Sequence, residues 1–188
     1  MAENRPWYPT SERPMRTSPA EFPTPPDDRY FDDYRQGAVF EFGPIAVEEA
    51  EVIAFARRFD PQSIHTDPQA AARGPFGGLI ASGWHTIGLL MRLFVEHYLT
   101  AVASLASPGV DEVRWIKPVR PGDRLRLRVT VSETRLSRSK PDRGIVHSFV
   151  EGINQRDEAA VSFKAMNLVG VRPVGGSVAS ASMGAPSP

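Results

Sequence analysis

Apolar residues recur at two different spacings, and the change in spacing divides the chain. In residues 47–58 they follow a helical period, with acidic residues in the first turn and arginines in the last, as the helix dipole favours. A short helix is expected to begin at Pro68, capped by Asp67. The longest helical pattern runs over about residues 84–105 and is apolar around most of its circumference. We therefore expect this helix to be buried on most sides.

Beyond the long helix the period changes to two, which is typical of strands. In residues 124–131 the side chains of Leu125, Leu127 and Val129 alternate with arginines, so one face is expected in the core and the other in solvent. The expected strands cover residues 39–42, 110–117, 124–131, 144–154 and 159–169. The fold class predicted by this order is α+β, with an antiparallel sheet curled around one central helix.

Composition separates the two ends of the chain from its middle. Seven of the 18 prolines fall within residues 1–28, where large apolar side chains are few, which favours an irregular arm. Residues 173–188 are rich in Gly, Ser, Ala and Pro and are expected to form a flexible tail. One ordered domain over residues 29–172 lies between them.

The charge balance and the missing cysteines exclude several classes of protein. The chain has 22 basic and 22 acidic residues, so it lacks the basic surplus of a nucleic-acid-binding protein. Without cysteine it has no disulfide, thiolate metal site or cysteine nucleophile, and we expect no metal. No apolar run has the length of a membrane span and the N-terminus lacks a signal-peptide core, so we expect a cytoplasmic location.

A candidate catalytic pair lies after the first helix. Asp60 and His65 are a carboxylate and an imidazole five residues apart, on a turn stiffened by Pro61. If both faced one cleft, a water held between them could lose a proton to one while the other gives or takes a proton, which is general acid–base chemistry. A structural interpretation also fits, in which Asp60 makes a local turn and His65 fills a gap in the packing.

A glycine-rich loop leads from Gly77 and Gly78 to Ser82 and Gly83, directly into the long helix. Free backbone N–H groups and the positive end of the dipole gather at such a helix start, where they can hold the oxygen of an enolate. Glycines there would equally serve close backbone packing and a helix cap. Together with the acidic and basic pair, the loop points to proton transfer next to a carbonyl.

Three runs of sequence resemble the MaoC-like dehydratases and (R)-specific enoyl-CoA hydratases. They are DPQSIHTDP at 60–68, FGGLIASGW at 76–84, and RWIKPVRPGD at 114–123, which carries a Pro-x-x-x-Gly-Asp turn. The resemblance covers about residues 30–170. It implies a hot-dog fold, a homodimer or higher homo-oligomer, and hydration of trans-2-enoyl thioesters or dehydration of (R)-3-hydroxyacyl thioesters. The substrate would be carried by CoA or a carrier protein, with no metal or redox cofactor.

The same resemblance assigns the catalytic roles to Asp60 and His65, which could exchange their proton-transfer roles, and the oxyanion hole to Gly83. The chain departs from the family pattern with Gln62 in place of an asparagine and Trp84 in place of a methionine. Met91 stands where some members have a serine. The expected substrate-binding residues are Gln62, Ile64, Ser82, Trp84 and His85.

Two other functions fit the same fold. A hot-dog thioesterase would, by family resemblance, often carry its catalytic carboxylate on the central helix, where Glu96 is the acidic residue. A non-catalytic acyl-thioester-binding subunit of a heteromeric dehydratase would keep the pocket and lack turnover. Outside the site, we expect His97 to be solvated or at an interface and His147 to be structural.

Overall fold

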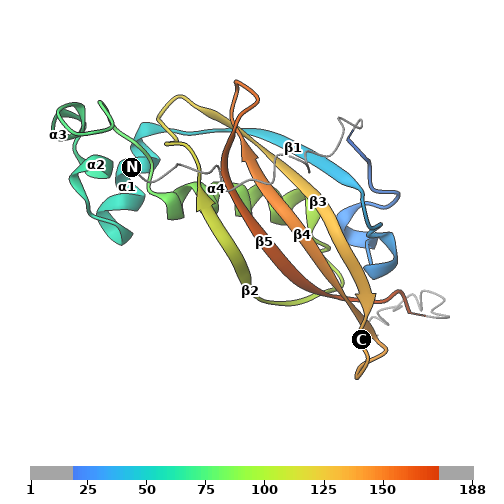
Figure 1. Cartoon of the computed structure of the whole chain (residues 1–188). Helices are drawn as coiled ribbons and strands as arrows, with labels where there is room; N and C mark the ends of the chain where they lie inside the picture. Colours follow the sequence, from blue (N-terminus) through green and yellow to red (C-terminus); the bar gives the residue numbers. More distant parts are fainter. Residues whose placement is uncertain (1–18, 174–188) are drawn as a thin grey trace, which may run out of the picture.

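The computed structural model describes residues 19–173 (Figure 1). Two short 3-10 turns come first, η1 (Pro26–Asp28) and η2 (Phe31–Asp33). The helices are α1 (Glu49–Phe59), α2 (Ser63–Thr66), α3 (Pro68–Ala72) and α4 (Gly83–Leu93), which a π-helical turn, η3 (Phe94–Tyr98), continues. The strands are β1 (Val39–Ala46), β2 (Ser104–Trp115), β3 (Arg124–Leu136), β4 (Arg143–Ile153) and β5 (Ala159–Gly170).

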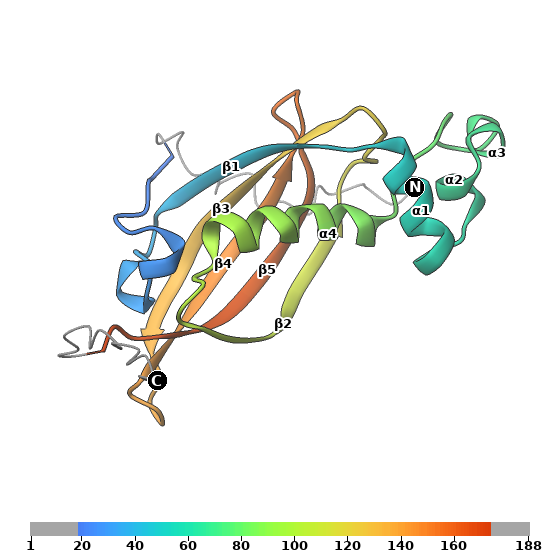
Figure 2. The same ribbon diagram turned by 180° about the vertical axis from the view of Figure 1, so that it is seen from behind.

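All neighbouring strands pair antiparallel, in the order β1-β3-β4-β5-β2. On β3 the side chains of Leu125, Leu127 and Val129 are fully buried, which confirms the predicted alternation with the arginines. Helix α4 lies along the inner side of the curved sheet (Figure 2). A sheet curled around a central helix is the expected α+β hot-dog fold.

The core fills the space between α4 and the sheet. Leu90, Leu93 and Phe94 on the helical segment are buried within it. Aliphatic side chains from the inner face of the sheet meet them, among them Leu125, Leu127, Val146, Val150, Val161 and Val169. Burying aliphatic side chains of this size contributes about 1.5–3 kcal/mol each, so this contact fixes the position of α4 on the sheet.

The predicted end of the long helix, near residue 105, is wrong. The helical segment ends at Tyr98, and β2 already begins at Ser104. The buried guanidinium of Arg29 explains this stop, because its Nη1 donates to the carbonyl oxygens of His97 at 2.7 Å and Tyr98 at 2.9 Å. The Tyr98 carbonyl also accepts the Tyr34 hydroxyl at 2.9 Å, so side chains satisfy carbonyls that a helix end leaves without intrahelical partners.

The expectation that the long helix is buried on most sides is also wrong for the single chain. Trp84 is 58% exposed and Val95 is 55% exposed, and both lie on the helical segment. The sheet covers one side of α4 and leaves the opposite side open (Figure 2). Strand β2, at one edge of the sheet, is exposed along nearly its whole length. Exposed apolar side chains therefore lie on both β2 and the outer side of α4, among them Val110 and Trp115 on the strand and Trp84 on the helix.

Residues 19–28, the described end of the predicted arm, pack against the domain. Phe22 stacks on Phe40 with ring centroids 4.0 Å apart, and the guanidinium of Arg29 lies 3.5 Å from the centre of the same Phe22 ring. Residues 1–18 and 174–188, to which the rest of the arm and nearly all of the tail belong, lie outside the described residues. Within residues 19–173, none of the helices combines the length and apolar character needed to cross a bilayer.

Candidate active site

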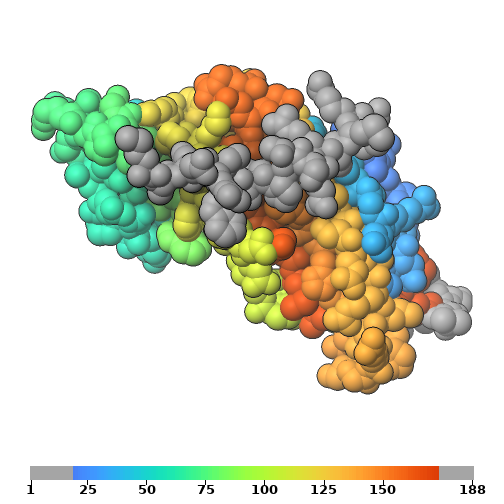
Figure 3. Space-filling view, in the orientation of Figure 1, coloured from blue at the N-terminus to red at the C-terminus, as the bar shows by residue number. Residues whose placement is uncertain are grey.

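The predicted catalytic pair lies where three short helical segments follow one another. Helix α1 ends at Phe59, and Asp60 is its C-cap, whose N–H donates to the carbonyl of Ala56 at 2.9 Å. Pro61 prevents the helix from continuing. Helix α2 then carries His65. The predicted cap of α3 is confirmed, since the Asp67 carboxylate accepts the N–H groups of Gln69 and Ala70. These segments project at one end of the molecule (Figure 3).

The structure brings Asp60 and His65 together, with Oδ2 of the carboxylate 3.4 Å from Nε2 of the imidazole. Two neutral donors also reach the carboxylate: Gln62 Nε2 donates to Oδ1 at 2.7 Å and Ser82 Oγ donates to Oδ2 at 2.7 Å. Hydrogen bonds to the charged form stabilise it. The bond from Gln62, the bond from Ser82 and the nearby imidazole together lower the pKa of Asp60, so the carboxylate is ionised at neutral pH.

The second ring nitrogen of His65 has a fixed role. His65 is buried, and its Nδ1 lies 2.8 Å from the carbonyl oxygen of Ile80. Because a carbonyl oxygen can only accept, Nδ1 carries a proton. Exchange of a proton is therefore left to Nε2, the nitrogen that faces Asp60.

The start of α4 completes the site. Ser82 is the N-cap, with Oγ accepting the N–H of Trp84 at 3.3 Å. Gly83 is the first helical residue, so its N–H has no acceptor inside the helix. A Cβ added at Gly83 would overlap the Nε1, Cε2 and Cδ1 atoms of Trp115, which lies against it. Gly83 therefore combines a helix-start donor with close packing, the two roles that its sequence left open.

The other predicted residues occupy different positions around this group. Gln62 contacts Asp60, as above, and the Ile64 carbonyl accepts the N–H of Ile80 at 3.2 Å. Trp84 is exposed and packs edge-on against Trp115, with ring centroids 5.4 Å apart. His85 is buried, with its ring centroid 5.1 Å from that of Phe55. Burial lowers its pKa, and its Nδ1 has no hydrogen-bond partner among the described residues.

Two features of the site were missed at the sequence level. Trp115 comes 32 positions after Gly83, at the end of β2, and it packs onto the glycine only because the sheet brings that strand end to the start of α4. Ile80 acts through its backbone carbonyl, a group that every residue has. For Trp115, the one available signal was a tryptophan near the end of a predicted strand. For the Ile80 carbonyl, the sequence carried no signal.

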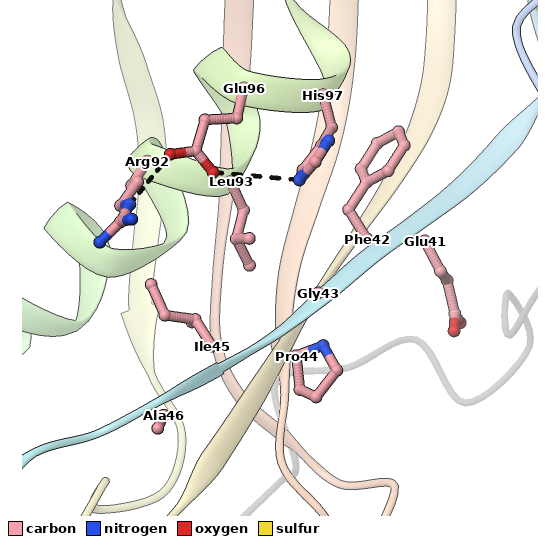
Figure 4. A pocket seen from close by; sticks show the side chains of 10 residues that line it. All are labelled: Glu41, Phe42, Gly43, Pro44, Ile45, Ala46, Arg92, Leu93, Glu96 and His97. Carbon is pink, nitrogen blue, oxygen red and sulfur yellow. Dashed lines mark hydrogen bonds and ion pairs between the residues drawn. The ribbon is translucent and has the colours of Figure 1, made fainter.

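A separate cavity of about 600 Å³ lies between β1 and the end of the long helix (Figure 4). Residues 41–46 line one wall, and Arg92, Leu93, Glu96 and His97 line the other. Its helix charges pair with one another, since Arg92 Nε lies 2.9 Å from one carboxylate oxygen of Glu96 and His97 Nε2 lies 4.0 Å from the other. Asp60, His65 and Gly83 do not line this cavity. Across residues 19–173, no three His, Cys, Asp or Glu side chains cluster as metal ligands.

Comparison with known proteins identifies the class. Residues 34–150 match the family described as MaoC like domain, and the chain belongs to this family. It is 31% identical to the uncharacterized protein YdeM of Bacillus subtilis over 126 residues, 67% of this chain and 88% of that protein. It is 42% identical to 3-hydroxyacyl-thioester dehydratase Z of Mycobacterium tuberculosis over 84 residues, 44% of this chain and 56% of that protein.

The fold is likewise similar to that of a solved family member. The crystal structure of the MaoC-like dehydratase from Rhodospirillum rubrum aligns with a TM-score of 0.72 at 39% identity. The alignment covers 78% of this chain and 99% of that chain.

Proposed function

We propose that this protein is a hydratase or dehydratase of acyl thioesters, which adds water to trans-2-enoyl thioesters or removes it from (R)-3-hydroxyacyl thioesters. The observation that carries the proposal is the Asp60–His65 pair, 3.4 Å apart, tied by Ser82 to the helix start where Gly83 lies. Family membership and the similarity to a dehydratase of M. tuberculosis support it.

In the proposed hydration, the ionised Asp60 takes a proton from water as the water oxygen bonds to the β carbon. The electrons of the double bond move toward the thioester, whose oxygen becomes an enolate held by the Gly83 N–H. The Nε2–H of His65 gives a proton to the α carbon, which converts the enolate back into a thioester. Asp60 then passes its proton across the 3.4 Å gap to Nε2, which restores both groups. Water is the only co-reactant, so the step needs no metal or redox cofactor.

The test is the loss of absorbance of the conjugated thioester when crotonyl-CoA or a longer enoyl-CoA is hydrated. We expect Asp60→Asn and His65→Ala each to lower kcat by at least about 100-fold, the usual contribution of a general acid or base. Asp67→Asn is the matched control, because asparagine caps a helix as well as aspartate does and the residue lies outside the pair. Unchanged rates in either catalytic variant would contradict the proposal.

Two readouts separate the proposal from its rivals. A thioesterase would release free CoA, which a thiol reagent detects, while a hydratase leaves the thioester intact. Glu96, the carboxylate that such a thioesterase would use, pairs with Arg92 and lines the separate cavity. A non-catalytic subunit would bind acyl-CoA without turnover and would gain activity only after addition of a partner chain.

The proposed active form is a homodimer joined along β2. Val102, just before β2, and Leu105, Val110 and Trp115 on β2 are all close to half exposed. Trp115 also contacts Trp84 on the exposed side of α4. Strand β2 pairs with β5 on one side, and its other edge faces outward. An open apolar edge strand is an aggregation hazard that proteins normally cover. A second copy of the chain would cover it with the same surface and add a strand pair.

A further inference from the structure

Ser82 makes a hydrogen bond that its place in the sequence does not suggest. Its side chain is fully buried at the N-cap of α4, where it would be expected to bond to the helix alone. Oγ does accept a helix N–H, that of Trp84 at 3.3 Å, but it also donates its own proton to Oδ2 of Asp60 at 2.7 Å. With the lone pair directed to the helix, the hydroxyl proton is directed to the carboxylate.

The link joins two parts of the site that come from different segments of the chain. Asp60 is the C-cap of α1, and Ser82 lies 22 residues later, directly before Gly83. The other short donor, Gln62 Nε2, belongs to an exposed side chain only two residues from Asp60, so it does not link the carboxylate to a distant segment. The Ser82 hydroxyl therefore ties the carboxylate to the helix start through a side-chain bond.

We infer that Ser82 is a positioning residue, whose hydroxyl holds the Asp60 carboxylate at a fixed place relative to the Gly83 N–H. The inference rests on the proposed hydratase function, in which Asp60 and Gly83 act on the two ends of one conjugated system. A displacement of one against the other lowers the rate because the reacting atoms must be aligned when the transition state forms.

The hydroxyl also acts on the charge of Asp60. The groups directed at this carboxylate are the Gln62 amide, the Ser82 hydroxyl and the imidazole of His65 from α2. All three favour the ionised form and lower the pKa of Asp60. Removal of a donor to the charged form raises the pKa of the carboxylate. Loss of the Ser82 hydroxyl should therefore move the acidic limb of the rate profile to higher pH, while a merely structural cap would leave that limb in place.

The experiment compares Ser82→Ala, Ser82→Gly and Ser82→Thr with the wild type over pH 4–9 on crotonyl-CoA. Glycine is a nearly adequate N-cap, so Ser82→Gly removes the hydroxyl with little loss of helix stability. We expect both hydroxyl-free variants to lose about 10-fold in kcat with a small change in KM, and their acidic limbs to rise by about 0.5–1 pH unit. Ser82→Thr keeps the hydroxyl and should restore both properties. Ser63→Ala is the control, because Ser63 is an exposed serine of the neighbouring helix α2.

The inference is overturned if Ser82→Gly keeps the wild-type limb and kcat, or if Ser82→Thr behaves like Ser82→Ala. A second measurement tests the role of Ser82 independently of the proposed function. Titration of carbon-13-labelled aspartate side chains by NMR reads the Asp60 carboxyl without any substrate. If the wild type hydrates no enoyl-CoA, the proposed function fails. Separately, an Asp60 titration that is the same in wild type and Ser82→Gly overturns the proposed link between Ser82 and Asp60.

Discussion

At the scale of single residues, the site depends on contacts that differ greatly in how visible they are in the sequence. Asp60 and His65 could be predicted as a pair because both are chemically distinctive and lie close together in the chain. The partner of the Ser82 hydroxyl could not be predicted, because the same serine fits an ordinary helix cap. The indole of Trp115 reaches Gly83 only through the sheet. Local patterns thus indicated the groups proposed to react, and tertiary packing determined which groups contact them.

Gly83 gives a prediction at this scale. A methyl group added there would overlap the indole of Trp115, so Gly83→Ala should destabilise the fold by about 1–3 kcal/mol and abolish hydration. Gly88 is the control on the same helix, because a Cβ there meets nothing within 4 Å. Gly88→Ala should raise stability by about 0.5–1 kcal/mol, since alanine is the better helix former. Urea unfolding measures both changes, and Trp115→Ala should partly rescue Gly83→Ala. Equal stability of the two alanine variants would contradict the packing argument.

At the scale of elements, the strands were easier to predict than the end of the long helix. Alternation on β3 identifies its buried face from nearest neighbours alone. The helix end has no comparable local signal, because apolar residues continue past Tyr98 to Leu99, Val102 and Leu105. The helix ends there because Arg29, 69 positions earlier than Tyr98, donates hydrogen bonds to the last carbonyl oxygens of the segment. An interaction over that separation lies outside any window of local periodicity.

Arg29 therefore gives a prediction about one element. Arg29→Leu removes a charged donor from both carbonyls, so the part-buried carbonyl of His97 loses its side-chain donor and that of Tyr98 keeps only the Tyr34 hydroxyl, at 2.9 Å. Hydrogen bonds to charged groups are worth about 1.5–3 kcal/mol, so the free energy of unfolding should fall by at least that amount. Amide hydrogen exchange should rise first in residues 94–103. Arg35→Leu, at an exposed arginine of the same segment, should leave both measurements unchanged. Similar losses in both variants would show that Arg29 has no special role at the helix end.

At the scale of the whole molecule, the neutral charge of the chain conceals an asymmetry. Residues 1–56 contain 11 acidic and 5 basic residues, whereas residues 114–143 contain 10 basic and 3 acidic. Part of this difference is cancelled inside the fold, where Glu41 on β1 pairs with Arg126 at 2.6 Å and Arg128 at 2.7 Å on β3. Two of the outward arginines of β3 are therefore held in ion pairs and are not simply solvated side chains. Charge pairing thus accompanies the β1–β3 contact, while the opposite edge, β2, carries exposed apolar side chains.

The open β2 edge gives the last prediction. In the proposed homodimer the exposed side chains of this strand are buried against a second copy, so sedimentation should give twice the 20.7 kDa chain mass at micromolar concentration. Val110, which is 44% exposed on β2, would lie in that interface. Val110→Glu should yield a monomer, because a buried unpaired carboxylate costs several kcal/mol. Leu136→Glu is the matched control: this residue is 57% exposed and ends β3, an inner strand of the sheet. A monomeric wild type, or dissociation by Leu136→Glu as complete as that by Val110→Glu, would refute β2 as the interface.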